Sequence, residues 1–159
     1  MKITVLAVGR IKEKYWNAAL EEYAKRLSRY AKLDLVEVED EPTPDNASPR
    51  EEAQIRAREG ERLLARLPKD AYPIALAIEG KTFDSPGMAR RIEALGVAGQ
   101  SHLCFVIGGS LGLAPAVLDQ AREAWSFSSL TFPHQLMRVI LLEQIYRSFR
   151  ISRGEPYHK

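Results

Sequence analysis

The sequence predicts an α/β protein with a parallel sheet and helices on both faces of that sheet. Strand-like apolar runs alternate with helical segments five times along the chain. Several of the runs are continuously apolar, which is typical of strands that are covered on both faces. The 159 residues, 45% hydrophobic and 28% charged, suffice for one sizeable core and not comfortably for two. We therefore expect a single domain over residues 1–159.

The first half of the chain contains two predicted strands, two helices and a loop. Residues 3–8 form the first apolar run, and apolar side chains then recur at helical spacing from Ile11 to Tyr30. Leu33–Val38 is a second strand, and residues 40–47, with two prolines and no periodicity, are a loop. Ser48-Pro49-Arg50-Glu51 is a capping box with proline at the first helical position, so a helix should run from there to about Leu67.

The second half continues the alternation and ends in a long helix. A strand is predicted over Ile74–Ile78, and Asp84-Ser85-Pro86 opens a helix that reaches about Leu95. The remaining predicted elements are a strand over Leu103–Ile107, a helix over Ala114–Ala124, an extended segment over Ser126–Phe132, and a helix from Pro133 or His134 to about Ile151.

Three loops follow the ends of predicted strands, where ligands of parallel sheets bind. They are Glu79-Gly80-Lys81, Gly108–Gly112 and Phe132-Pro133-His134. The glycine-rich segment is open to two interpretations, a phosphate cradle or a tight structural turn. No Gly-Lys-Ser/Thr follows it, so the pattern gives nucleoside triphosphate binding little support.

The histidines and the single cysteine give little indication of metal or thiol catalysis. The three histidines are dispersed, so we expect no metal site; His102 is predicted at the surface. His134 opens the last helix, where it either bonds exposed amides or acts in function. The single cysteine, Cys104, lies in an apolar strand and is predicted as core. With no disulfide framework, no signal-peptide pattern and no membrane-spanning run, we expect a cytoplasmic protein.

The net charge is only +2, but its distribution is uneven. Residues 1–33 hold eight Lys or Arg and three Glu, and residues 134–159 hold five basic and two acidic residues. Residues 34–70 hold six basic and eleven acidic residues. The basic ends are either solvated helix faces or surfaces that converge on a polyanion.

The last helix and the tail after it give the strongest signals. The helix carries apolar side chains around most of its circumference, among them Leu136, Ile140 and Phe149. Such a helix needs burial on nearly every side, in the core or in a subunit interface. In the tail, Arg153–Lys159, tyrosine could stack on a base, lysine could hold phosphate and histidine could exchange a proton, although most termini carry no function.

Longer motifs resemble a known family. The segments Phe105–Leu113, Phe127–Arg147 and Pro156–Lys159 are similar to those of the RlmH family, SPOUT-class methyltransferases that act on 23S ribosomal RNA. The similarity extends over the whole chain and includes Val5–Gly9 and Ala75–Lys81. The resemblance implies a parallel-sheet SPOUT-type fold with a C-terminal trefoil knot, and a homodimer.

The resemblance also implies the reaction and the cofactor. The expected reaction is methylation of N3 of a pseudouridine in the decoding-region stem-loop of 23S rRNA, on assembled ribosomes. The methyl donor is S-adenosylmethionine, whose sulfonium already activates the methyl group, so no metal is expected. The positions implied to bind this cofactor are Leu76, Gly108, Phe127, Ser128, Ser129, Leu130, Thr131 and Phe132.

On this resemblance we expect the tail of one subunit to close over the cofactor pocket of the other. Tyr157 would orient the target base, His158 would accept its proton and Lys159 would bind phosphate or the developing anion. The weaker candidates for RNA contact are Arg138, Lys12, Lys14, Lys25 and Arg29. A non-catalytic ribosome-binding or assembly factor, and a nucleotide-phosphate enzyme built on Gly108–Gly112, remain the alternatives.

Overall fold

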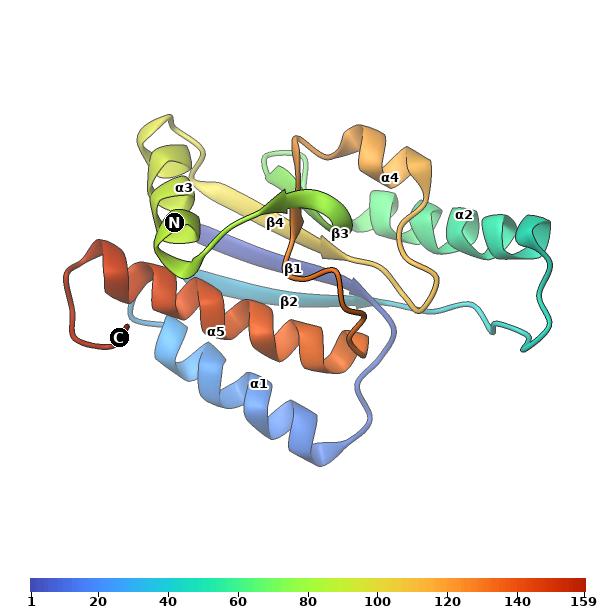
Figure 1. The fold of residues 1–159 in the computed structure, drawn as a ribbon, viewed down its shortest axis with the longest axis horizontal. Coiled ribbons are helices and arrows are strands. Elements are labelled where there is room, and N and C mark those ends of the chain that lie inside the picture. Colours follow the sequence, from blue (N-terminus) through green and yellow to red (C-terminus); the bar gives the residue numbers. More distant parts are fainter.

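A computed structural model describes residues 1–159 and shows a sheet of five parallel strands. The strands are β1 (Lys2–Val8), β2 (Lys32–Val38), β3 (Tyr72–Thr82), β4 (His102–Ile107) and β5 (Glu123–Ser126). Their order across the sheet is β2-β1-β4-β3-β5, and every neighbouring pair is parallel (Figure 1). All five carboxyl ends therefore lie at one edge, where the predicted ligand loops come together.

Helices cover both faces of this sheet, as predicted. They are α1 (Lys14–Leu27), α2 (Pro49–Arg66), α3 (Ser85–Val97), α4 (Pro115–Gln120) and α5 (His134–Ser152). Helices α1, α3 and α5 enclose the larger hydrophobic core against one face, and α2 and α4 enclose a smaller core against the other. The sequence prediction of a doubly covered parallel sheet is confirmed.

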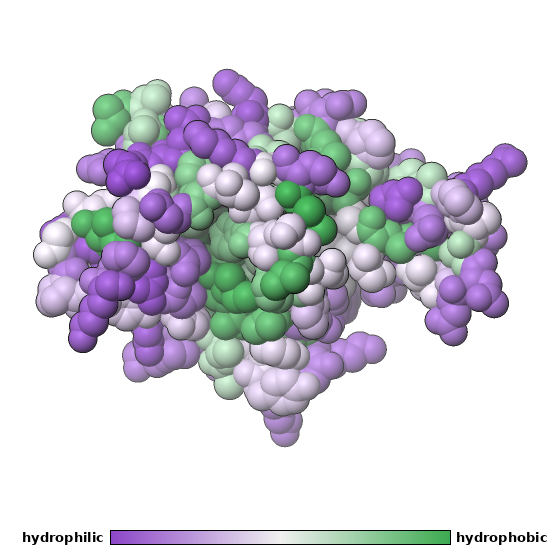
Figure 2. Space-filling view, viewed as in Figure 1, coloured by the Kyte–Doolittle hydropathy of each residue, from purple (hydrophilic) through white to green (hydrophobic).

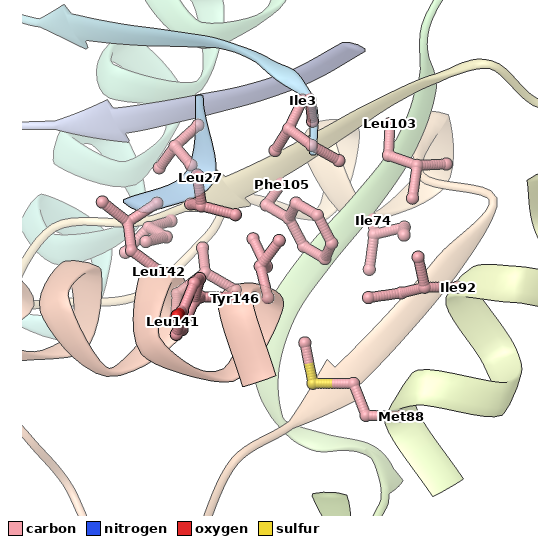
Figure 3. Packing of buried hydrophobic residues seen from close by; sticks show 14 of the residues in the cluster. Ile3, Leu27, Ile74, Met88, Ile92, Leu103, Phe105, Leu141, Leu142 and Tyr146 are labelled. Carbon is pink, nitrogen blue, oxygen red and sulfur yellow. The ribbon is translucent and has the colours of Figure 1, made fainter. Parts of the chain in front are cut away.

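The larger core lies where β1, β3 and β4 meet α5 and α3. Ile74, Leu103 and Phe105 extend from the strands toward Leu141 and Tyr146 of α5 and Met88 and Ile92 of α3 (Figure 3). Phe105 and Leu141 are fully buried. Burying each such side chain contributes about 1.5–3 kcal/mol, so this layer fixes the position of α5 on the sheet.

Local sequence signals placed several element ends correctly. The Ser48 hydroxyl accepts from the Glu51 amide at 3.1 Å, and the Glu51 carboxylate accepts from the Ser48 amide at 3.3 Å, which confirms the capping box. The first helix is shorter than its periodicity suggested, because Ile11 and Tyr30 lie outside α1 while still packing into the core.

The segment between β4 and α5 differs most from the prediction. Helix α4 ends at Gln120 instead of Ala124, and Glu123–Ser126 form strand β5; the extended segment predicted over 126–132 begins too late. The physical reason is a tertiary contact. Residues 74–76 of β3 pair with residues 123–125, and this pairing overrides the helical pattern that the same residues continue.

Strand β3 is longer than predicted, so Glu79-Gly80-Lys81 lies within the strand rather than in a loop after it. The strand is irregular there: Leu76 and Lys81 both pair with Trp125, and the register shifts between them. A Cβ on Gly80 would lie 2.6 Å from the backbone of Ala124. Only glycine allows β3 to pass so close to β5 at this point.

Candidate active site

A cavity of about 940 Å³ lies at the carboxyl edge of the sheet. Its walls come from the distal part of β3, the glycine-rich segment after β4, and the segment between β5 and α5. About half of the lining residues are hydrophobic. The volume and the mixed lining are those of a pocket for a cofactor-sized ligand.

Most of the residues expected to bind a cofactor line this cavity. Leu76, Gly108, Phe127, Ser128, Leu130, Thr131 and Phe132 all belong to its wall. Ser129 does not line it and is exposed. Residues up to 56 positions apart in the sequence thus line one cavity, because β3, β4 and β5 are parallel and end at the same edge of the sheet.

The glycine-rich segment 108–112, called the glycine loop below, is a tight turn that forms part of the cavity wall. The Gly112 amide donates to the Gly109 carbonyl at 3.1 Å, and Gly112 has φ +84°. A Cβ on Gly108 would lie 2.7 Å from the carbonyl carbon of Gly112. The tight-turn interpretation therefore holds, and the same turn presents backbone to the cavity.

His134, at the first turn of α5, also lines the cavity. Its Nδ1 accepts from Arg138 Nη2 at 3.5 Å, and its ring packs against Gly9, which has φ +96°. Burial, and then the positive charge of Arg138, lower the pKa of His134 below its usual 6.5. A neutral imidazole thus faces the cavity at neutral pH.

Arg138 is not an RNA contact, and that expectation is wrong. The side chain is buried, with 4% of the residue exposed. Arg138 Nη2 donates to the carbonyl oxygens of Gly9 at 2.6 Å and Val8 at 3.2 Å, and Nη1 pairs with the Glu37 carboxylate. Arg138 therefore ties the start of α5 to the end of β1, beside the cavity.

The tail residues lie away from the cavity in the same chain. The Tyr157 hydroxyl donates to Glu143 Oε1 at 2.9 Å, and its ring meets Tyr146 edge-on at 5.0 Å between centroids. Burial and the Glu143 hydrogen bond raise the pKa of Tyr157. Arg147 Nη1 lies 3.2 Å from His158 Nδ1, and Lys159 is exposed.

A second cavity of about 620 Å³ adjoins the first. His158 lines it together with Ile140 and Gln144 of α5 and the start of α3. Ser126 and Phe127 line both cavities. The tail thus reaches the neighbouring cavity but not the one that holds the expected cofactor positions.

Two predictions about isolated residues had different outcomes. His102 is buried, which corrects the expected surface position: its Nε2 lies 2.8 Å from Thr4 Oγ1 and its Nδ1 lies 3.2 Å from the Asp70 carboxylate. Cys104 is core, as predicted, and burial raises the pKa of its thiol to about 12.

No cluster of three or more His, Cys, Asp or Glu is placed to hold a metal ion. None of the helices is both long and apolar enough to cross a membrane.

Comparison with known proteins gives the family. The family model described as "Predicted SPOUT methyltransferase" matches residues 1–158. The chain belongs to the SPOUT methyltransferase family. Relatives named ribosomal RNA large subunit methyltransferase H are 58% identical in Bifidobacterium adolescentis, 55% in Clostridium novyi and 54% in Clostridium botulinum. Each alignment covers all of both chains, which confirms the resemblance to the RlmH family.

A solved structure has a similar fold at low sequence identity. It is that of a probable methylase family protein from Haemophilus influenzae, which superposes with a TM-score of 0.54 at 11% identity. The match covers 99% of this chain and 70% of that one. At this identity the likeness concerns the fold alone.

The sequence patterns did not indicate two polar residues of α2 that lie at or near this cavity, Arg56 and Glu59. Arg56 lines the cavity, and Glu59 lies behind the glycine loop. The helical spacing of the sequence could have indicated that Glu59 is buried. It stands four residues from both Ile55 and Leu63, on the buried stripe of its helix.

Proposed function

We propose that the protein transfers a methyl group from S-adenosylmethionine to N3 of a pseudouridine in the decoding-region stem-loop of 23S rRNA, on assembled ribosomes. The observation that carries this proposal is the cavity of about 940 Å³ lined by seven of the eight expected cofactor residues. The names of the full-length relatives support the substrate class, ribosomal RNA of the large subunit. A ribosomal substrate also implies a cytoplasmic enzyme.

The residues present suit this cofactor. Apolar side chains such as Leu76, Phe127 and Phe132 offer surfaces to an adenine ring, and the glycine loop offers close backbone approach. The bound cofactor supplies a sulfonium methyl group. The protein then has to hold the target base in line with that methyl and accept the proton of N3; orientation of this kind contributes about 7–11 kcal/mol and a positioned base roughly 10²–10⁴-fold.

We assign the base-contacting residues to the tail of a partner subunit in a homodimer. Within one chain, Tyr157 and His158 pack on α5 and do not line the cofactor cavity, so a second tail would have to supply them there. In these roles Tyr157 orients the base, His158 accepts the proton and Lys159 holds phosphate or the developing anion. The apolar surface over α5 in Figure 2 supports a subunit interface at this helix.

We also propose that the chain forms the trefoil knot of the family. The support is an irregular pairing of β3 with β5: Leu76 and Lys81 of β3 both pair with Trp125, and the register shifts between them (Figure 1). A knot would hold β3 and β5 together at the cavity wall.

Label transfer tests the proposed function. Labelled S-adenosylmethionine is incubated with assembled ribosomes that lack the modification, and with bare 23S rRNA. We expect label on the ribosomes, mapped to N3 of one pseudouridine. Cofactor binding without label on either substrate would contradict the proposed substrate. Failure to bind the cofactor at all would favour a non-catalytic ribosome-binding factor.

Deletion of residues 157–159 tests the role of the tail. We expect methyl transfer to be abolished while the Kd for S-adenosylmethionine stays within a few fold, because the roles assigned to these side chains concern the target base, its proton and phosphate, and not the cofactor. The measurement is label transfer paired with calorimetric titration. Normal turnover by the truncated protein would rule out the assigned roles.

Exposed lysines and an arginine near the start of the chain are the proposed RNA contacts. Lys12, Lys14, Lys25 and Arg29 are all exposed. Binding through phosphates releases counterions, so affinity for ribosomes should fall steeply as salt rises. Replacing Lys12 and Lys14 with Gln should flatten this dependence in a filter-binding assay, whereas a flat profile for the unmodified protein would argue against these contacts.

A further inference from the structure

Glu59 is a buried acid behind the cofactor cavity. It belongs to α2 and is 4% exposed, on a helix whose other acidic residues are exposed or half-buried. Acidic side chains are almost never fully buried unless they are paired. The contacts of this carboxyl group therefore call for an explanation.

One carboxyl oxygen of Glu59 has a partner and the other does not. Oε2 accepts from the Glu41 amide at 3.0 Å, which holds the loop after β2. Oε1 is inaccessible to solvent and has no hydrogen-bond partner. Both oxygens face Gly109 of the glycine loop, since a Cβ there would lie 3.1 Å from Oε1 and 3.2 Å from Oε2.

The surroundings of the carboxyl group raise its pKa. Burial raises the pKa of Glu59, the negative charges of Asp40 and Glu41 add to this, and the Glu41 amide and Arg62 act in the opposite direction. Arg62 is itself engaged with the Glu41 carboxylate and with the Glu39 carbonyl at 3.0 Å. From the opposite side, the glycine loop and β1 present Gly109 and the apolar Val8.

We propose that Glu59 is a positioning residue of the cofactor cavity, which joins the loop after β2 to the glycine loop through its two carboxyl oxygens. Oε2 holds the Glu41 amide. Oε1, when it carries the proton, donates to a backbone oxygen of the glycine loop as that loop lies against the cofactor. The buried oxygen without a hydrogen-bond partner is thus the group available for this bond.

Amide hydrogen exchange on the protein without cofactor tests the first half of this proposal. We expect Glu59→Ala to speed exchange at the Glu41 amide, which loses its acceptor, and in residues 108–113, because Gly109 loses the carboxyl group that faces it. Glu59→Gln should exchange like the unmodified protein, since its amide oxygen still accepts from Glu41. Glu61→Ala, an exposed position on the same helix, is the matched control and should change neither loop.

Calorimetric titration with S-adenosylmethionine tests the second half, which rests on the proposed function. Loss of one hydrogen bond predicts roughly tenfold weaker binding by Glu59→Ala. For the unmodified protein, Kd should rise with pH as Glu59 loses its proton, and for Glu59→Gln it should not. His134 and Glu79 also line the cavity and are unchanged in Glu59→Gln, so a pH dependence that either causes would persist in that variant. The pKa of His134 is lowered by burial and by Arg138, so this group is already neutral above pH 7.

A further variant keeps the test decisive if Glu59→Ala folds poorly. Gly109→Ala places a methyl group against both carboxyl oxygens and should reproduce the faster exchange and the weaker binding. Unchanged exchange in Glu59→Ala and Gly109→Ala, or a pH dependence that persists in Glu59→Gln, would overturn the proposal. If the unmodified protein binds no cofactor, the proposed function fails, and the exchange data alone then decide whether Glu59 positions the two loops.

Discussion

At the scale of single residues, charged side chains at both edges of the sheet join elements that are distant in the sequence. Arg138 joins α5 to β1, and Glu123 joins β5 to β3 and α3. Each bonds several partners from distant parts of the chain. Removing one of these groups leaves its partners buried without a bond, which is more destabilising than the loss of the bond itself.

Replacing Arg138 tests this for α5. Arg138→Leu removes the side-chain donor to the carbonyls of Gly9 and Val8 and the ion pair of the Glu37 carboxylate, which keeps only the Ile11 amide. We expect the free energy of unfolding to fall by about 3 kcal/mol in urea denaturation, at the lower end for broken buried pairs because Glu37 is partly exposed. Arg138→Lys should recover only part of the lost stability, since an ammonium group lacks the planar, branched arrangement of donors of a guanidinium. A loss below about 1 kcal/mol would contradict the assigned role.

Glu123 predicts a pH dependence of stability. Burial alone would raise its pKa, but hydrogen bonds from Arg91, Trp125 and Tyr72 lower it from 4.5 to about 2. Because the pKa is lower in the folded state, the contribution of about 3 kcal/mol is present above pH 4.5 and is lost as the pH falls toward 2. The unfolding free energies of the unmodified protein and Glu123→Gln should therefore converge in acid. A difference that is constant from pH 7 to pH 3 would exclude this linkage.

At the scale of elements, the close approach of β3 and β5 shapes the cavity wall. Gly80 lies where β3 passes the backbone of β5, and Trp125 packs between Phe83 and Phe105 with ring centroids 4.9 and 5.5 Å away. A rigid junction here fixes the segment that follows β5. That segment carries most of the expected cofactor contacts.

A methyl group at Gly80 should disrupt this junction. In Gly80→Ala the added Cβ would lie 2.6 Å from the Ala124 backbone, so β3 or β5 must move. We expect a loss of about 3 kcal/mol or more in the free energy of unfolding. Gly96→Ala is the matched control, because its Cβ would meet only the flexible end of Met1 and should leave stability unchanged or slightly improved. Equal stability of the two variants would show that β3 tolerates the displacement.

At the scale of the whole molecule, α5 is both the central support of the core and a surface of the molecule. Leu141, Leu142 and Ile145 are fully buried against the sheet, while Leu136 and Ile140 on the outer side are only half-buried. Apolar surface lies over this helix and is bordered by hydrophilic residues (Figure 2). This arrangement supports the proposed homodimer and places the second cavity beside the interface.

A charge on the outer side of α5 should separate the subunits. We expect Ile140→Asp to shift the protein from dimer to monomer in sedimentation equilibrium, because a carboxylate in a closed apolar interface loses its hydration. Methyl transfer should fall with it, since the cavity then lacks a second tail. Val97→Asp, at a position that is 85% exposed on α3, is the control and should leave the mass unchanged. A monomeric unmodified protein would remove the basis of this prediction.

Much of the fold follows from local patterns in the sequence. The strands β1, β2 and β4, the capping box of α2 and the start of α5 were predicted because apolar periodicity and capping chemistry act within a few residues. Of the three segments predicted as ligand loops, Gly108–Gly112 and Phe132-Pro133-His134 line the cavity, whereas Glu79-Gly80-Lys81 lies within β3 and contributes only Glu79. The family resemblance then indicated which residues of these segments are expected to bind the cofactor.

By itself, the sequence determined the class of fold, the family and the convergence of its loops at one edge of the sheet. Only the tertiary structure decided that residues 123–126 pair as a strand and that Arg138 and His102 are buried. It also decided that the tail does not line the cavity formed by the expected cofactor positions of the same chain. The physical reason is range. Helical periodicity is set by neighbours three or four residues away, whereas strand pairing and the burial of a charge depend on partners up to about 130 residues distant.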